Sequence, residues 1–459
     1  MNGTRVHFIA IGGSAMHNLA LALHFKGYKV SGSDDEIFDP ARKRLADCGL
    51  LPEKQGWFPE KLSPEIDSVI LGMHARADNP ELARAKRLGL KIYSYPEFLY
   101  EQSKDKLRVV IGGSHGKTTI TAMILHVLKL AGIDCDYMVG AKLEGFDVMV
   151  KLSEEARFMV FEGDEYLTSA MDPRPKFHLY KPDIALISGI AWDHMNVFPT
   201  YEKYKEQFRI FAGMVPGNGS IVYCAADQEV NSLVLDLPGE MLKLPYGVPD
   251  YRIEKGVTYL KTPDGEIALK VFGRHNLMNL EGARLVCGLL EIEDKLFYEA
   301  IASYNGASNR LEMLALNDNS TIYRDFAHAP SKLKATIHAV REQYPYRKLV
   351  ACFELHTYSS LNRDFLEQYS GSMNDADEAI VFFSPHALRL KKLPALDAAE
   401  IKKSFGGKKI RVFTKADELS TLLESMEWKN SSLLMMSSGN FDGLNLKDLA
   451  TGLLGQNSK

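Results

Sequence analysis

The sequence predicts an α/β protein of three domains, each built on a largely parallel sheet. Short apolar runs alternate with helical patterns along the whole chain, and two glycine-rich loops each lie between an apolar run and a helical pattern. The 459 residues are enough for three domains, at roughly 150 residues per domain. We expect an N-terminal Rossmann-like domain, a central P-loop domain with a parallel or mixed sheet, and a C-terminal Rossmann-like domain.

The expected first domain covers residues 1–105. A helical pattern passes through Leu19, Leu21 and Leu23, and four apolar runs predict parallel strands at 6–10, 28–31, 68–71 and 90–93. This alternation is typical of βαβ units. A polar, lysine-rich link at 102–106 ends the pattern, and we place a domain boundary there.

The second and third domains are expected at 106–310 and 311–459. The pattern restarts with an apolar run, a glycine loop and a helix, and later runs predict the remaining strands. The second domain has its strands at 107–111, 158–161, 184–187 and 220–223, its helix at 117–130 and a hairpin within 251–271. After a polar stretch at 304–309, the third has strands at 321–324, 348–353, 379–383, 410–413 and 433–436, and a helix from Ser331.

Composition excludes several classes of function. Hydrophobic residues make up 46% and charged residues 25% of the chain, as in globular proteins. The 55 basic and 59 acidic residues give a net charge of -4, which argues against a nucleic-acid partner bound by bulk positive charge. The five cysteines form no CxxC pair, and no run approaches the ~18 apolar residues that a membrane-spanning helix needs. We therefore expect a cytoplasmic protein with reduced thiols that binds neither nucleic acid nor a membrane.

The strongest motif is Gly112-Gly-Ser-His-Gly-Lys-Thr-Thr119, between a predicted strand and a predicted helix. The backbone N–H groups of such a loop bind phosphate oxygens, Lys117 would neutralise phosphate charge, and Thr118 would hold Mg²⁺. The usual pattern has a glycine five positions before Gly116, where Ile111 stands here, so the loop is a shortened variant. A plain glycine turn before Lys-Thr is the alternative. We take binding of a nucleoside triphosphate as the hypothesis.

A second loop, Ala10-Ile-Gly-Gly-Ser-Ala15, follows the first predicted strand, and Asp34 ends the second at the separation typical of a ribose-binding acid. A tight turn that packs a helix on a sheet would give the same pattern. With a P-loop in the next domain, the pair of loops favours a protein that binds two different nucleotides. One would supply energy and the other would be part of the substrate.

Polar groups also follow several predicted strands of the later domains. Glu162-Gly-Asp-Glu165 and Asp193-His194 come after apolar runs, at the sheet edge where metal-holding groups of α/β sites lie, although a solvated loop would look alike. Asn276 and Asn279 lie three apart at a helix start, where they can face an adenine edge or act as caps. Asp325 to Pro330 closes a strand and opens a helix, which also fits an ordinary capping turn.

Taken in this order, these residues resemble the Mur ligase family, whose ATP-dependent members join amino acids or peptides to UDP-N-acetylmuramate. The resemblance spans nearly the whole chain. It rests on the first glycine turn with Met16, Ser31–Asp34, Gly113–Thr119, Glu162–Glu165, Asp193-His194, Gly273–Asn276 with Asn279, Arg310, and Asp325–His328 with Pro330.

The resemblance implies a UDP-sugar site in the first domain, an ATP site in the second and a peptide-binding third domain. The implied UDP-sugar site consists of Gly12, Gly13, Ser14, Ala15, Met16, Asp34 and His74. The implied ATP site consists of Gly113, Ser114, His115, Gly116, Lys117, Thr118, Thr119, His275, Asn276, Asn279, Arg310 and Asp325. The implied catalytic residues are Lys117, Glu162, His194 and His328, with Mg²⁺ held by Thr118, Glu162 and His194.

The implied reaction phosphorylates the muramoyl carboxylate with ATP, and an amine then attacks the acyl phosphate to give an amide. Within the family, Asp164-Glu-Tyr166 followed by Asp172-Pro-Arg-Pro-Lys-Phe177 is similar to the recycling ligase that adds the murein tripeptide L-alanyl-γ-D-glutamyl-meso-diaminopimelate. The segments Phe353-Glu354 and Met436 to Phe441 favour the same enzyme. The ligase that adds L-alanine is the alternative. Two other classes stay open, an NAD-dependent oxidoreductase and a non-catalytic nucleotide switch.

Overall fold

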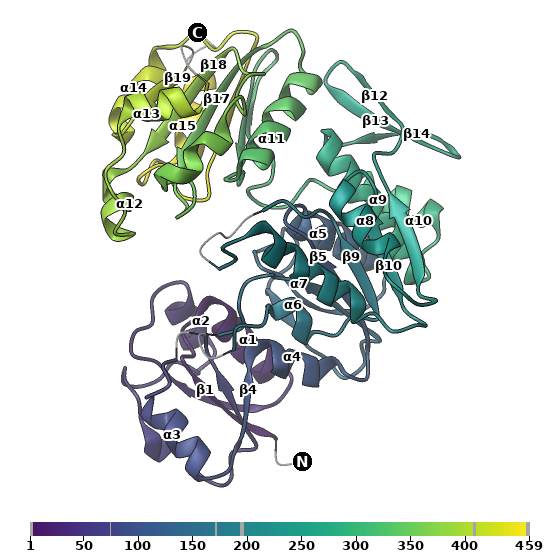
Figure 1. Ribbon diagram of the computed structural model, residues 1–459, viewed down its shortest axis with the longest axis vertical. Helices are drawn as coiled ribbons and strands as arrows, with labels where there is room; N and C mark the ends of the chain where they lie inside the picture. The colour runs from purple at the N-terminus through teal and green to yellow at the C-terminus, as the bar shows by residue number, and fades with distance from the viewer. Residues whose placement is uncertain (1–2, 74, 170–171, 193–196, 407–409, 456–459) are drawn as a thin grey trace. The chain divides into compact units, whose positions relative to one another are not determined.

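The structure is a computed structural model that describes residues 3–73, 75–169, 172–192, 197–406 and 410–455 (Figure 1). Four sheets follow one another along the chain. The contacts group the chain into two compact units, each considered separately below. The first unit contains residues 1–190, 201–246 and 285–290, and the second contains 191–200, 247–284 and 291–459.

The first sheet is parallel and follows the predicted strands. Its order is β2 (Lys29–Ser33), β1 (Arg5–Ile9), β3 (Ser68–Leu71) and β4 (Lys91–Ser94). Its helices are α1 (Ser14–Phe25), α2 (Ala41–Asp47), α3 (Pro80–Arg87) and α4 (Tyr95–Ser103). Because β2 and β3 lie on opposite sides of β1, the loop after β1 lies at a switch point, where α/β sheets bind ligands.

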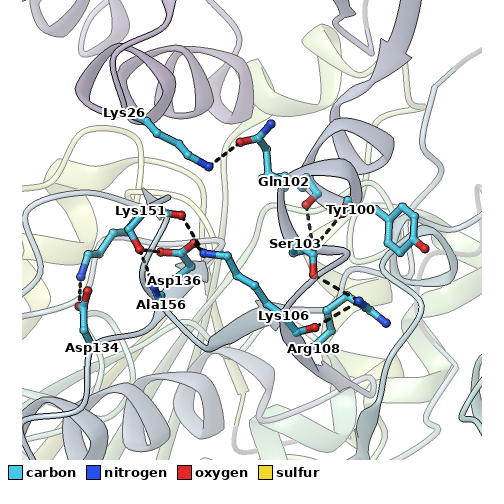
Figure 2. Close-up of polar contacts among 12 residues, drawn as sticks. Lys26, Tyr100, Gln102, Ser103, Lys106, Arg108, Asp134, Asp136, Lys151 and Ala156 are labelled. Atoms are coloured by element: carbon cyan, nitrogen blue, oxygen red, sulfur yellow. Dashed lines mark hydrogen bonds and ion pairs between the residues drawn. The ribbon is translucent and has the colours of Figure 1, made fainter. Parts of the chain in front are cut away.

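The link between the first two sheets is held by polar contacts (Figure 2). Lys106 lies between α4 and β5 (Leu107–Gly112), and its Nζ donates to Asp136 Oδ2 at 2.6 Å and to the Ser153 carbonyl at 2.8 Å. The Asp136 side chain is fully buried, so it needs this partner. Arg108 Nη1 donates to the Ser103 carbonyl at the end of α4. The lysine-rich link is therefore an ordered connection.

The second sheet has seven strands and places three loops of the site side by side. Its order is β11 (Leu242–Tyr246), β10 (Ser220–Cys224), β9 (Ile184–Ile187), β5, β8 (Phe158–Glu162), β6 (Asp136–Met138) and β7 (Val150–Lys151), with β7 alone antiparallel. Its helices are α5 (Lys117–Leu130), α6 (Lys176–Leu179), α7 (Tyr201–Gly213) and α8 (Gln228–Leu235). Since β5 lies between β8 and β9, the loops after these three strands meet at one sheet edge.

Buried aromatic rings pack α6 and α7 together. Phe177 is fully buried, and its ring stacks on Phe211 with the centroids 4.5 Å apart. Phe208 meets the same ring edge-on at 5.4 Å. This packing fixes the start of α6, which carries one of the cavity side chains described below.

The second compact unit begins with an antiparallel sheet of β12 (Tyr251–Glu254), β13 (Val257–Thr262) and β14 (Gly265–Leu269), followed by α9 (Arg274–Leu289) and α10 (Asp294–Ile301). Thr258 Oγ1 donates to Gln343 Oε1 at 2.8 Å, and Gln343 Nε2 donates to the Gly256 carbonyl at 2.6 Å. These bonds join the small sheet to α11 (Pro330–Gln343), across the boundary predicted at residue 310. The predicted bounds of the three domains therefore stay a prediction.

The last sheet has six strands in the order β15 (Glu312–Leu316), β16 (Thr321–Asp325), β20 (Ser431–Met436), β17 (Lys348–Leu355), β18 (Glu378–Phe383) and β19 (Ile410–Phe413), and only β15 is antiparallel. Helix α11 and α13 (Ala398–Ser404) pack in one apolar cluster. Helices α14 (Ala416–Ser425) and α15 (Leu446–Gly455) pack in the other. A 3-10 helix η2 (Arg363–Tyr369) and α12 (Pro385–Leu390) complete this region (Figure 1). The predicted α/β class with parallel and mixed sheets is confirmed.

Two smaller predictions concern the whole chain. All five cysteines are free thiols, as predicted, and four are buried while Cys48 is partly exposed. Within the part of the chain that the structure describes, no helix has the length and apolar character needed to cross a membrane.

Candidate nucleotide and acid site

The loop between β5 and α5 has the shape that binds phosphate. Gly113 has a φ of +128°, and a Cβ there would lie 2.2 Å from Ser188 Oγ, so only glycine fits. Ser114 N donates to the Gly189 carbonyl at 2.9 Å, and the His115 carbonyl accepts a hydrogen bond from the Ser188 hydroxyl. Ser188 and Gly189, in the loop after β9, therefore fix the backbone conformation of the glycine loop. Gly116, with a φ of +76°, ends the loop, and α5 begins at Lys117. The N–H groups in the first turn of a helix have no partner within the helix and can bind an anion.

Lys117 opens α5 and is held by two oxygens. Its Nζ donates to the Gly113 carbonyl at 2.6 Å and to Glu165 Oε2 at 2.7 Å. The Glu165 side chain is 1% exposed, and the Tyr204 hydroxyl donates to its other oxygen at 3.2 Å. Burial lowers the pKa of Lys117, but the neighbouring carboxylates, Glu165 first and then Asp164 and Glu162, together outweigh burial and raise this pKa above its ordinary value. Lys117 is therefore a protonated, oriented cation at the mouth of the loop.

Thr118 and Glu162 offer hard oxygen donors side by side. Thr118 Oγ1 donates to Glu162 Oε1 at 2.6 Å, and Gly140 N donates to Glu162 Oε2 at 2.8 Å. Hydroxyl and carboxylate oxygens are the ligands that Mg²⁺ prefers, so this pair fits the ion. The third predicted ligand, His194, lies with Asp193 outside the described residues. Among the residues that are described, no three His, Cys, Asp or Glu side chains gather as a metal site.

A cavity of 290 Å³ joins this loop to the N-terminal glycine turn. Its walls carry the charges of Lys117, Glu162, Asp164 and Lys176. The lining residues are Ser14, Ala15, Asn18, Tyr95, Lys117, Met138, Val139, Gly140, Met149, Val150, Glu162, Asp164, Lys176 and Tyr180. The two glycine loops that the sequence placed in different domains therefore open onto one space.

The N-terminal turn is fixed by Asp34. Gly12 N donates to Asp34 Oδ2 at 2.7 Å, and a Cβ on Gly12 would lie 2.9 Å from that oxygen. Burial raises the pKa of Asp34 to about 6, against the lowering effect of the Gly12 N–H. Gly13 caps α1, and Met16 is buried in its first turn. In this structure Asp34 shapes the turn, and its predicted role at a ribose stays a prediction.

His74, the remaining member of the implied UDP-sugar site, lies outside the described residues. The implied phosphate-binding Thr119 is buried in the first turn of α5.

The implied adenine-facing residues lie together in the second unit. Asn276 and Asn279 are both buried near the start of α9. Asn276 Nδ2 donates to the Phe272 carbonyl at 2.9 Å, whereas a helix-capping asparagine would accept from a backbone N–H. Burial lowers the pKa of His275, opposed by the Asp325 carboxylate. The interaction of His275 with Asp325 links α9 to the end of β16.

Asp325 organises the turn after β16. Its Oδ2 accepts from Leu311 N at 2.7 Å and its Oδ1 accepts from Ala327 N at 2.8 Å. The Arg310 guanidinium lies over the Phe326 ring, 4.5 Å from its centroid. His328 Nδ1 is 3.0 Å from the Phe326 carbonyl, and the Tyr369 hydroxyl donates to the His328 carbonyl at 2.6 Å. The structure therefore brings Asp325 together with Arg310, His328 and the start of α9, and the predicted roles of these residues toward ATP stay predictions.

Sequence reasoning missed several residues around the P-loop and its cavity. Glu165 belonged to a recognised acidic cluster, but nothing in the sequence paired it with Lys117. Lys176 was noted only as part of a motif, and Tyr180 carried no signal at all. Ser188 and Gly189 directly follow the strand predicted at 184–187. That position was the one feature of the sequence that could have indicated their contact with the glycine loop.

The fold and this site define a P-loop nucleotide-binding α/β protein that has a second glycine loop at the same cavity. Three family profiles cover most of the chain, "Mur ligase family, catalytic domain" at residues 5–106, "Mur ligase middle domain" at 111–287 and "Mur ligase, glutamate ligase domain" at 309–439. The chain belongs to the Mur ligase family and is an ATP-dependent amide ligase.

Individual relatives extend over nearly the full length. The UDP-N-acetylmuramate–L-alanine ligase of Carboxydothermus hydrogenoformans is 30% identical over 96% of this chain and 95% of its own. The crystal structure of the UDP-N-acetylmuramate-alanine ligase of Thermotoga maritima is 20% identical, with a TM-score of 0.69 over 99% of this chain and 100% of that one. The UDP-N-acetylmuramate:L-alanyl-γ-D-glutamyl-meso-diaminopimelate ligase of Neisseria meningitides is 25% identical, with a TM-score of 0.59 over 66% of this chain and 98% of that one. These likenesses confirm the three-domain architecture predicted from the sequence.

Proposed function

We propose that this chain is a cytoplasmic ligase that joins the carboxylate of UDP-N-acetylmuramate to an amine and converts ATP to ADP and phosphate. One observation carries the proposal. The 290 Å³ cavity is lined by Lys117 and Glu162 of the phosphate site and by Ser14 and Ala15 of the N-terminal turn. A ligase that phosphorylates a nucleotide-linked acid needs its two nucleotide loops to open onto one space, because the acid must reach the γ-phosphate.

The residues of the cavity fit the first half of that reaction. An oxygen of the substrate carboxylate attacks the γ-phosphorus, the bond from phosphorus to the β,γ-bridging oxygen breaks, and ADP leaves. Lys117 and the N–H groups at the start of α5 stabilise the negative charge on the transferring group. Thr118 and Glu162 would hold Mg²⁺, which neutralises phosphate charge when bound.

The second half needs an uncharged amine and protection from water. The amine nitrogen attacks the acyl carbon, the carbon–oxygen bond to phosphate breaks, and the nitrogen gives up a proton to leave an amide. An acyl phosphate is also open to attack by water, so the reaction requires a site that excludes it. We propose that His328 acts on the reacting groups and that Asp325 contributes to ATP binding, as the family resemblance implies.

L-alanine is the amine that the comparisons support better. The sequence favoured the murein tripeptide, but the curated relatives at 30% identity over 96% of the chain are named L-alanine ligases. Both candidate amines present the α-amino group of an alanyl residue, so the chemistry above serves either. They differ in what the enzyme must accommodate beyond that residue.

The tripeptide stays the second candidate because of two observations. The Neisseria meningitides relative named for that tripeptide is 25% identical to this chain. The motif that resembled such enzymes is also ordered, since Leu167 and Pro175 form an antiparallel bridge and Thr168 N donates to the Arg174 carbonyl at 2.9 Å. This segment ends at Lys176, in the wall of the cavity.

The test supplies purified enzyme with ATP, Mg²⁺ and UDP-N-acetylmuramate, and either L-alanine or the tripeptide. ADP and the mass of the amide product are measured, with Lys117→Ala as the inactive control. Product with L-alanine alone supports the first candidate, and product with the tripeptide alone supports the second. If neither amine yields product and ADP, the proposed function is wrong.

A further inference from the structure

The cavity contains a second cation besides the P-loop lysine. Lys176 begins α6 and lines the same 290 Å³ space as Lys117. Its Nζ donates to Asp164 Oδ2 at 2.6 Å. Lys176 lies outside the glycine loop, so the phosphate chemistry described above leaves it without a role.

The segment from Asp164 to Phe177 holds Lys176 in place. Tyr166 N donates to Asp164 Oδ1 at 3.0 Å, and Lys176 N donates in turn to the Tyr166 carbonyl at 3.0 Å. Phe177 N donates to the Asp164 carbonyl at 3.1 Å, and the Phe177 ring is fully buried. Residues 176 and 177 are thus bonded to residues 164 and 166, and the Phe177 ring is anchored in the aromatic core. The backbone position of Lys176 is therefore fixed while its ammonium group faces the cavity.

The two ion pairs at the cavity differ in how easily a ligand can open them. Glu165, the partner of Lys117, has a side chain that is 1% exposed, whereas the Asp164 side chain is 42% exposed. A carboxylate in contact with water is readily resolvated when its cation turns to another anion, and such pairs contribute little stability. Lys176 is therefore the cation that can exchange its partner for a bound acid.

Tyr180 supplies an independent sign that the cavity is built for a polar ligand. Its side chain is fully buried and lines the cavity, and its ring stacks on Phe161 at 4.3 Å. Among the described residues, its hydroxyl has no hydrogen-bond partner. Buried hydroxyls without a partner are costly. An oxygen acceptor bound in the cavity would satisfy it.

We propose that Lys176 binds the carboxylate of the acid substrate and, after phosphoryl transfer, the acyl phosphate, with the Tyr180 hydroxyl as a second donor. The inference rests on the proposed function. The acid must approach a cavity that already contains the carboxylates of Glu162 and Asp164, and like charges repel it. Lys176 offsets that repulsion, whereas Lys117 binds the phosphate. The phosphoryl transfer forms one oxygen–phosphorus bond, breaks another and moves no proton, so Lys176 positions the acid and is neither a general acid nor a general base.

The experiment isolates the first half-reaction. Enzyme, ATP, Mg²⁺ and UDP-N-acetylmuramate are mixed with hydroxylamine in place of the amine, and the acyl phosphate is trapped as a hydroxamate and quantified with ADP. Lys176→Met removes the charge and keeps the length of the side chain, and Lys176→Arg keeps the charge. Lys181→Met is the matched control, because that lysine is close in sequence but lies over the Tyr100 ring outside the cavity lining.

For Lys176→Met we expect kcat/KM for UDP-N-acetylmuramate to fall by about 10- to 150-fold, the range of a lost charge-assisted hydrogen bond. The KM for ATP should stay within about twofold, because Lys117 is untouched. Lys176→Arg should recover most of the loss. Tyr180→Phe, which keeps the packing of the ring, should lower hydroxamate formation by about 3- to 10-fold.

The outcomes separate this inference from the proposed function. If the wild-type enzyme forms no ADP with UDP-N-acetylmuramate, the proposed function fails and this inference fails with it. If the wild-type enzyme is active and Lys176→Met has the same kcat/KM as Lys181→Met, only the assignment of Lys176 is overturned. Should Lys176→Met fold poorly, Lys176→Gln, which removes the charge and keeps a polar side chain, decides together with Tyr180→Phe, since unchanged acid kinetics in both variants contradict the assignment.

Discussion

Replacing Lys117 by methionine should destabilise the protein as well as stop the reaction. Lys117 Nζ and Glu165 Oε2 lie 2.7 Å apart. At an effective dielectric constant of about 20 their attraction is about 6 kcal/mol before the cost of desolvation. In Lys117→Met, the Glu165 side chain, which is 1% exposed, keeps the Tyr204 hydroxyl at 3.2 Å but loses its cation. Removing one partner of a buried ion pair costs about 3–5 kcal/mol.

The assay is a double-mutant cycle. Thermal unfolding is measured for the wild type, Lys117→Met, Glu165→Gln and the double variant at neutral pH. Lys117→Met should lower the melting temperature by at least about 6 °C, from about 3 kcal/mol in a unit of this size. The double variant should regain most of that loss, since it leaves no unpaired buried charge. Both variants that lack Lys117 should be inactive, which separates stability from catalysis.

Two results would refute this reasoning. Lys117→Met could melt within about 1 °C of the wild type, which would mean that Glu165 is compensated without its cation. Alternatively, the effects of the two single variants could simply add in the double variant, which would mean that the pair is not energetically coupled.

Three further predictions follow from the same contacts. Glu162→Gln should lower Mg²⁺-dependent ADP formation by about 100-fold or more, because the carboxylate beside Thr118 is lost; an unchanged rate across a Mg²⁺ titration would contradict this. Phe177→Ala should cost about 3–5 kcal/mol in thermal melts, because it empties a fully buried aromatic site, and a loss below about 1 kcal/mol would show that the site collapses easily. Burial raises the pKa of Asp34 to about 6. The contribution of Asp34 to the free energy of unfolding is therefore greatest at pH values below the pKa of an exposed aspartate, and it declines as the pH rises through about 6. Asp34→Asn should therefore gain stability relative to the wild type between about pH 4 and about pH 7.5, and a constant difference in melting temperature would contradict the shift.

The strands and the phosphate loop could be predicted because their signals are local. The apolar run at 107–111, the glycines after it and the helical pattern from Lys117 are consecutive in the chain, and the structure has β5, the loop and α5 at those positions. Asn276 and Asp325 could be singled out for similar reasons, since each lies at the start or end of a predicted element. Their contacts were undetermined, because the same residue types also act as caps.

The domain boundary predicted at residue 310 shows what local sequence patterns do not report. The polar stretch at 304–309 predicted a domain boundary, which stays a prediction; Thr258 and Gln343, which lie on either side of it in the sequence, are hydrogen-bonded to each other. Such a bond depends on how a small sheet docks on a helix 85 residues further along. No periodicity in either segment reports that docking.

The sequence by itself determined the α/β class, the order of the strands along the chain, the phosphate loop and, through the combined motifs, the resemblance to the Mur ligases. These features depend on side-chain periodicity and on glycines at fixed spacing, which are readable without knowing what packs against what. The tertiary structure alone decided that Glu165 pairs with Lys117, that Ser188 permits only glycine at Gly113, and that the N-terminal turn shares a cavity with Lys117 and Lys176. Each of those contacts joins residues far apart in the chain. The first two form because the parallel strands of the second sheet bring their carboxyl ends to one edge, and the third depends on the packing of α1 and α4 against β7 and α6.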